Sequence, residues 1–187
     1  MLTKPTAAVV PTALAALLLA TAGPAAAATS TFTDKADDIG PGVDLRSVKV
    51  VNGEQNLRIT TTHRDLRRSP ATAAGGTVFI DTDPDDKGPE YALIGGYFDG
   101  TDYTLLEVEG WRTSSDDVER VSCSYRSRLD YRADTVRSRF AQDCFDDDGD
   151  TGPVRVEVRV SGAKKGGGTA VDWLGTPRTF SAAVQQG

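Results

Sequence analysis

The sequence is poor in the residues that most catalytic and metal sites require. Among its 187 residues are one histidine, two cysteines and one methionine. A serine hydrolase needs a base beside its nucleophile, but the chain offers only His63 and has no Gly-x-Ser-x-Gly motif. We expect His63 to be an exposed polar residue at the end of a strand, and we expect the protein not to be an enzyme. The alternative is a small hydrolase that uses His63 or a pair of carboxylates, whose separation the sequence does not reveal.

The chain also lacks a second long apolar run and an excess of basic residues. Residues 1–28 contain Lys4, an apolar run and an alanine tract, which together are the pattern of a secretory signal peptide. We therefore expect a secreted, extracellular protein without a membrane span and with a single domain in residues 29–187. The net charge of −6 argues against nucleic acid or anionic lipid as a partner, because both attract basic proteins. Arginine outnumbers lysine, but we infer no mechanism from this bias. We expect the protein to be a monomer.

No part of residues 29–187 has an apolar period of 3.6 that is long enough to predict a helix. Several segments instead alternate apolar and polar side chains, most regularly at Val154, Val156, Val158 and Val160, which is typical of half-buried strands. About nine or ten such strands with short polar connections predict an all-β fold, an antiparallel β-sandwich, with a closed barrel as the alternative. The segments from which these strands are drawn are residues 44–51, 56–62, 78–80, 91–98, 101–110, 119–125, 128–131, 135–144, 154–160, 171–173 and 179–184.

Turn and glycine signals separate these strands. Asn52-Gly53 between two alternating runs predicts a tight hairpin, because both residues tolerate a positive φ, and Asp99-Gly100 predicts another. Gly95-Gly96 within a strand predicts a bulge or a close backbone approach. Residues 29–41 predict either an extended lead-in or a loosely ordered terminus.

The two cysteines, Cys123 and Cys144, predict a disulfide. An exported protein meets an oxidising compartment, where an even number of cysteines normally pairs. The bond would close a loop of about 20 residues and, by restricting the unfolded chain, would add about 3 kcal/mol to the free energy of unfolding. The spacing is unlike the Cys-x-x-Cys of zinc sites.

The sharpest chemical feature is an acidic turn that follows an apolar strand. The strand passes into Asp81, Asp83, Asp85 and Asp86, whose carboxylates repel one another unless a cation or water screens them. Calcium takes about six to eight oxygen ligands, so the turn is a candidate calcium site, and we expect any metal bound there to be calcium. A solvated acidic turn is the alternative. The second acidic loop, Asp146–Asp150, ranks lower, and neither loop has the spacing of an EF-hand.

Trp111 and Trp173 are the candidate ligand-binding residues. Exposed aromatic rings stack on the faces of sugars, so these side chains predict a carbohydrate site, with glycan or cell-wall material as the partner. Each tryptophan lies in or next to a predicted strand, so packing in the core or at its rim is the alternative.

Several short motifs occur in an order that is similar to a known group of proteins. They are Asp-Asp-Ile-Gly at 37–40, Val-Lys-Val-Val at 48–51, Asn-Leu-Arg-Ile-Thr at 56–60, Val-Phe-Ile-Asp-Thr-Asp-Pro at 78–84 and Thr-Asp-Tyr at 101–103. The chain thereby resembles uncharacterised secreted actinobacterial β-sandwich proteins and, more distantly, DOMON-like domains and the carbohydrate-binding modules of family nine. The resemblance implies a jelly-roll sandwich, a non-catalytic binding or accessory module with sugar or calcium sites on its loops. Some such domains hold haem through Met and His ligands, but here the single methionine is Met1, in the signal peptide.

Overall fold

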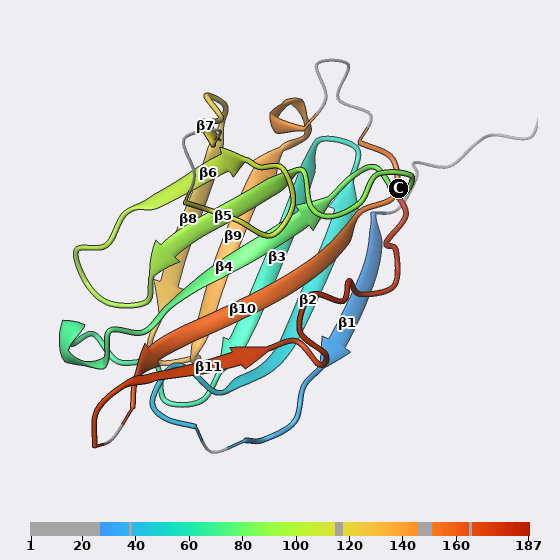
Figure 1. Ribbon diagram of the computed structural model, residues 1–187. Coiled ribbons are helices and arrows are strands. Elements are labelled where there is room, and N and C mark those ends of the chain that lie inside the picture. Colours follow the sequence, from blue (N-terminus) through green and yellow to red (C-terminus); the bar gives the residue numbers. More distant parts are fainter. Residues whose placement is uncertain (1–26, 38, 115–117, 146–150, 165) are drawn as a thin grey trace, which may run out of the picture.

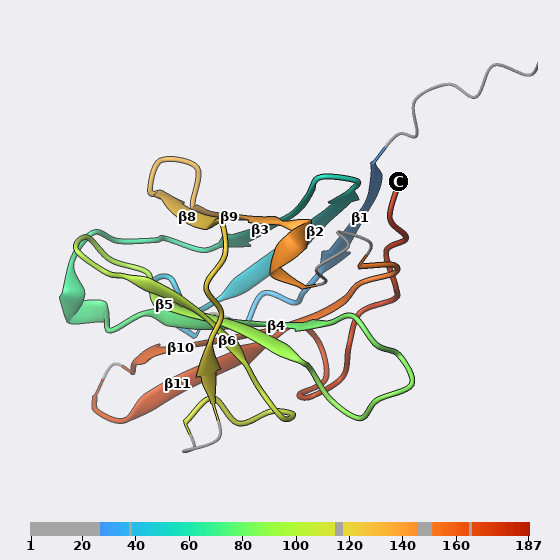
Figure 2. The same ribbon diagram turned by 90° about the horizontal axis from the view of Figure 1, so that it is seen from above.

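The computed structural model describes residues 27–187 apart from residues 38, 115–117, 146–150 and 165. Its strands form two antiparallel sheets packed face to face, so the all-β sandwich prediction is confirmed (Figures 1 and 2). Sheet A has five strands in the order β1-β2-β3-β9-β8, and sheet B has six in the order β11-β10-β4-β5-β6-β7. The elements are β1 (Ala28–Thr33), β2 (Leu45–Gly53), β3 (Asn56–His63), η1 (Pro70–Thr72), β4 (Gly75–Asp81), β5 (Tyr91–Gly96), β6 (Tyr103–Glu107), β7 (Glu119–Arg120), β8 (Tyr125–Asp130), β9 (Thr135–Ala141), η2 (Gln142–Cys144), β10 (Arg155–Ala163) and β11 (Thr169–Trp173). Within these described ranges, no helix has the length and apolar character of a membrane span.

Alternating side chains place one hydrophobic core between the two sheets. In β10, Val156, Val158 and Val160 are fully buried in this core, whereas Arg155 and Arg159 lie on the opposite face of the strand. Each buried valine contributes roughly 1.5–3 kcal/mol through loss of apolar surface to water. The period of two in the sequence therefore predicted both the strand and the side of it that faces the core.

The hairpin between β2 and β3 forms as predicted, but its turn lies two residues later. β2 continues through Gly53, and Glu54 and Gln55 make the turn. The prediction that Asn52 belongs to the turn was wrong, because this residue is fully buried in the strand. Its side-chain amide donates to two backbone carbonyls from the C-terminal part of the chain, at 2.9 and 3.1 Å. Those long-range bonds override the local turn preference.

Glycines in β4 and β5 leave room for two tyrosines in the core. A Cβ atom added at Gly76 would overlap the Tyr97 hydroxyl, and one at Gly95 would overlap the Tyr103 ring. The pairing of β5 with both neighbouring strands is regular. The group that approaches Gly95 closely is a side chain, the Tyr103 ring, rather than the predicted backbone, and the alternative of a bulge was wrong.

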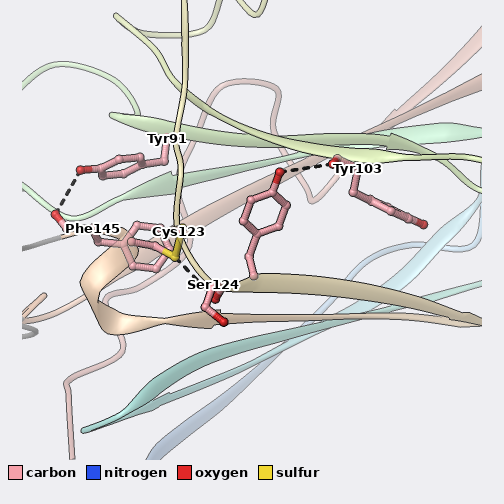
Figure 3. The surroundings of a disulfide bond; sticks show 7 residues. Tyr91, Tyr103, Cys123, Ser124 and Phe145 are labelled. Carbon is pink, nitrogen blue, oxygen red and sulfur yellow. Dashed lines mark hydrogen bonds between the residues drawn. A yellow bond between two sulfur atoms is a disulfide. The ribbon is translucent and has the colours of Figure 1, made fainter.

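The disulfide between Cys123 and Cys144 is confirmed, with an S–S distance of 2.10 Å and a Cα–Cα distance of 5.3 Å. Cys123 lies in the segment that crosses from β7 in sheet B to β8 in sheet A, and Cys144 ends η2 just after β9 (Figure 3). Nearby, the Tyr91 hydroxyl of sheet B donates to the Phe145 carbonyl at 3.1 Å. The disulfide therefore ties the segment between β7 and β8 to the end of η2, where the edges of the two sheets meet.

The two ends of the domain differ from the predicted strands. Residues 29–33 belong to β1, which pairs with β2 along its whole length, so the first part of the lead-in is a strand and its described residues after Thr33 are not. Residues 179–184 are not a regular strand, and their one bridge joins Val184 to Val154. All but the last two residues of the predicted signal peptide, 1–28, lie outside the described residues.

Candidate functional site

The structure places the predicted calcium ligands in two environments. Asp81 ends β4 with its carboxylate buried, and it forms an ion pair with Arg155, its direct partner on β10. Burial, and next the neighbouring carboxylate of Glu90, raises the pKa of Asp81 to about 6. The guanidinium of Arg155 also lies over the Phe180 ring, 5.1 Å from its centroid. The carboxylate of Asp81 is therefore engaged in an ion pair within the fold.

The other three carboxylates of the turn, Asp83, Asp85 and Asp86, are exposed. Asp83 accepts a hydrogen bond from the Asp85 N–H at 2.9 Å, and this contact helps to shape the loop. Among the described residues, no three acidic, histidine or cysteine side chains lie close enough together to hold a metal ion. Calcium binding at this turn stays a prediction, and the second candidate loop, Asp146–Asp150, lies outside the described residues.

An acidic groove of about 930 Å³ lies beside the turn. Lys87 is the one cation among its described lining residues. The carboxylates that line it are Asp85, Asp86, Glu90, Glu107, Glu109 and Glu119. Negative charge is thus concentrated at the end of sheet B that carries β6 and β7.

Trp111 and Trp173 lie in a second, smaller hydrophobic cluster on the outer face of sheet B. Their ring centroids are 6.4 Å apart with planes inclined at 70°, so the rings do not form a parallel pair. Phe79 packs against both rings, at 5.0 Å from Trp111 and 6.3 Å from Trp173, and Phe180 stacks on Trp111 at 4.9 Å. Both tryptophans are half-buried. Their described contacts are packing contacts, and sugar binding by them stays a prediction.

Glu157 fixes the chain segment that follows β11. Its side chain is fully buried, and it accepts hydrogen bonds from the backbone N–H groups of Val158, Leu174 and Thr179 at 3.0, 3.1 and 3.3 Å. Burial raises the pKa of Glu157 to about 8, although the three N–H donors favour the ionised form. The Glu157 carboxylate therefore holds the backbone at Leu174 and Thr179 in place beside the tryptophan cluster.

The prediction that His63 is exposed was wrong. The residue ends β3 with 3% of its surface exposed, and its ring meets Tyr97 edge to face with centroids 4.9 Å apart. Its Nε2 lies 2.6 Å from the Thr61 hydroxyl. Burial lowers the pKa of His63 to about 3, so the ring is neutral at pH 7. The physical reason is the strand period, because His63 continues the inward-facing positions Leu57, Ile59 and Thr61.

The outer face of sheet A, where the sequence analysis placed no site, carries aligned rows of polar side chains. Strand pairing aligns the outward-facing residues of all five strands across the sheet. The first row contains Thr29, Val51, Arg58, Arg139 and Arg126. The second row contains Thr31, Lys49, Thr60, Arg137 and Arg128. We call these the two cationic rows, and a third row, from Thr33 to Asp130, lies beside the second.

The cations of this face are exposed, and few of them form ion pairs. The six of them are Lys49, Arg58, Arg126, Arg128, Arg137 and Arg139. Asp99 and Asp130 line one groove with Arg128 and Arg137, and Asp99 and Asp102 line another with Arg126. Asp130 is the one carboxylate among the outward-facing residues of these five strands, and it lies 3.8 Å from Arg137. Arg139 donates a hydrogen bond to the Asn56 side chain at 2.7 Å. The remaining four cations form no ion pair with any described carboxylate.

Like charges therefore face one another directly on neighbouring strands. Arg139 pairs in register with Arg58 on one side and with Arg126 on the other, and Arg137 pairs with Arg128. Each such like-charged pair destabilises a sheet by about 0.2–1 kcal/mol. Two Arg-x-Arg runs in consecutive strands were the sequence signal for this surface, and the analysis of overall charge did not use it. A face that is costly for stability and open to solvent is a candidate binding surface.

No protein-family model matches this chain, and no curated protein matches it in sequence. The relationship to DOMON-like domains and family nine carbohydrate-binding modules therefore stays a prediction.

Proposed function

We propose that this protein is a secreted, non-catalytic binding module that holds an anionic partner on the outer face of sheet A. The observation that carries the proposal is the set of six exposed cations in two aligned rows, accompanied by one carboxylate. Five of the six are arginines, whose planar guanidinium groups bind carboxylate, sulfate or phosphate oxygens in pairs.

Two further features support the proposal. The enclosed ring of His63 supports a non-catalytic role, because a general base must come within hydrogen-bonding distance of its substrate. The disulfide supports secretion, because such bonds persist mainly in oxidising compartments. The overall charge of −6 is compatible with an anionic partner, since the charge is unevenly distributed and six carboxylates line the acidic groove of sheet B.

The experiment is affinity gel electrophoresis through dextran sulfate, a polyanion probe. Two double variants remove the same charge from different places: Arg126→Gln/Arg128→Gln on the outer face of β8, and Arg112→Gln/Arg120→Gln outside sheet A. We expect the probe to retard the wild type and the Arg112/Arg120 variant, and to retard the Arg126/Arg128 variant much less. Retardation should also decline with salt, because exposed charges are screened. Equal retardation of the two variants, or none of the wild type, would contradict the proposal.

A second candidate function is binding of a neutral glycan by Trp111 and Trp173. The observation in its favour is that two half-exposed indoles share one outer face, with the guanidinium of Arg159 5.9 Å from the Trp173 ring centroid. A glycan array with Trp111→Ala and Trp173→Ala tests this function. Binding of neutral glycans that survives both changes would remove these rings from the account.

Calcium stabilisation is a separate proposal for the acidic turn. Asp81 already has Arg155 as its partner, so the exposed carboxylates of Asp83, Asp85 and Asp86 are the ones that would hold the ion. Hard carboxylate oxygens suit calcium better than zinc, which prefers histidine or cysteine.

A further inference from the structure

We infer that the anionic partner is an acidic polysaccharide that lies across the strands of sheet A, along the two cationic rows. This inference rests on the proposed function and adds the chemical class of the partner and the direction in which it lies.

The spacing of the cations matches a chain of acidic sugars. Neighbouring strands are about 4.8 Å apart, and alternate residues along one strand are about 6.8 Å apart. The first row contains one arginine on each of three neighbouring strands, Arg58 on β3, Arg139 on β9 and Arg126 on β8. These arginines are therefore spaced by the distance between strands. A pyranose in an extended polysaccharide advances by a distance close to the strand spacing. One sugar can thus face each strand, and carboxylates that alternate between the edges of the polymer meet one row and then the other.

The same rows continue from charges to hydroxyl groups. On β1 the outward-facing residues are Thr29, Thr31 and Thr33, all exposed, and Thr60 of β3 lies between Lys49 and Arg137 in the second row. A threonine hydroxyl both donates and accepts hydrogen bonds, so it pairs with sugar hydroxyls. A track with cations at one end and hydroxyls at the other therefore matches a polymer that carries both carboxylates and hydroxyls.

Other polyanions match this face less well. Single-stranded nucleic acid stacks its bases on aromatic side chains, and no outward-facing residue of the five described strands is aromatic. Attachment to an anionic bilayer is strengthened by apolar side chains that enter the lipid, whereas the outward-facing apolar residues here are Val51 and Ala141. The face therefore favours a ligand recognised through charges and hydroxyl groups.

The test is calorimetric titration of the full-length protein with matched probes. Polygalacturonate supplies carboxylates and hydroxyls, its methyl ester keeps the hydroxyls without the charge, and polyacrylate keeps the charge without the hydroxyls. We expect polygalacturonate to bind at least about tenfold more tightly than the methyl ester, and more tightly than polyacrylate or a thymidine oligonucleotide. Arg126→Gln/Arg128→Gln should weaken polygalacturonate binding by about fivefold or more, because each exposed ion pair contributes modestly. Arg112→Gln/Arg120→Gln should leave it unchanged.

Hydroxyl variants separate this inference from the broader proposal. Thr31→Val/Thr60→Val keeps the shape of the second row and should weaken polygalacturonate binding about threefold or more without changing polyacrylate binding, while the control Thr169→Val on β11 should change neither. If polyacrylate, the oligonucleotide or phosphatidylserine vesicles bound as tightly as polygalacturonate, and the threonine variant bound normally, the polysaccharide inference would be overturned. The proposal that the outer face of sheet A binds an anionic partner would remain. If no polyanion bound, both would be overturned.

Discussion

Neutralising the arginines of β8 should stabilise the protein. Arg126 faces Arg139 and Arg128 faces Arg137 directly across the pairing of β8 with β9, and neither β8 side chain forms an ion pair with a described carboxylate. Arg126→Gln and Arg128→Gln each remove one repulsive pair on an exposed edge strand. The double variant should therefore unfold with a larger free energy than the wild type, in the opposite direction to most substitutions.

The size of the gain follows from the strand register. A like-charged pair directly opposite on neighbouring strands is worth about 0.2–1 kcal/mol, so two pairs give roughly 0.4–2 kcal/mol. For a domain of this size the midpoint of thermal unfolding should rise by about 1–8 °C. The gain should shrink in 1 M salt, where the Debye length is about 3 Å.

Differential scanning calorimetry at low and high salt measures the change in the unfolding midpoint. Arg155→Gln is a comparison variant that should lower the midpoint instead of raising it. Arg155 neutralises the buried carboxylate of Asp81, so its removal should lower the free energy of unfolding by about 3 kcal/mol. A lowered midpoint for Arg126→Gln/Arg128→Gln at low salt would show that the rows are not electrostatically strained, and it would refute the reasoning.

Three other predictions concern stability. Cys123→Ser/Cys144→Ser opens a loop with a sequence separation of 21 and should lower the free energy of unfolding by about 3 kcal/mol; an unchanged thermal midpoint would contradict this. Because the folded-state pKa of His63 is depressed from 6.5 to about 3, its contribution is complete above pH 6.5 and is lost as the pH falls towards 3. From pH 7.5 to pH 4.5 the wild type should lose about 2–3 kcal/mol more than His63→Gln in urea unfolding, and equal losses would argue against a buried neutral ring. Calcium at 100 times its dissociation constant should add roughly 2.7 kcal/mol, and Asp83→Asn/Asp85→Asn should abolish the gain; a wild-type midpoint unmoved by calcium would leave the turn as a solvated loop.

The fold was largely predictable because a period of two is a local signal. The four valines from Val154 to Val160 and the alternating runs around the β2–β3 turn give the strands and their buried sides directly. Where prediction failed, a long-range contact decided. Asn52 stays in its strand because its side chain bonds to carbonyls in the C-terminal part of the chain. His63 is buried because β3 extends one residue beyond its predicted end, and that residue faces the core.

The candidate site was harder to predict because it depends on register between distant strands. Arg58 and Arg139 are far apart in sequence, and only the pairing of β3 with β9 makes them neighbours. Overall charge hid the surface as well, since an acidic protein can still gather its arginines on one face. The sequence identified Trp111 and Trp173 as candidate ligand-binding residues, but it did not reveal Phe79 and the other rings that pack around them.

The most direct test of the binding surface is NMR chemical-shift mapping with a short oligogalacturonate at low salt. Backbone amides of β3, β8 and β9 should shift in a saturable manner, with smaller shifts in β1 and β2, and those of β4, β5 and β10 should stay in place. Shifts centred on Trp173 in β11 or on the acidic turn, with β8 and β9 unaffected, would contradict the assignment of the outer face of sheet A as the ligand site.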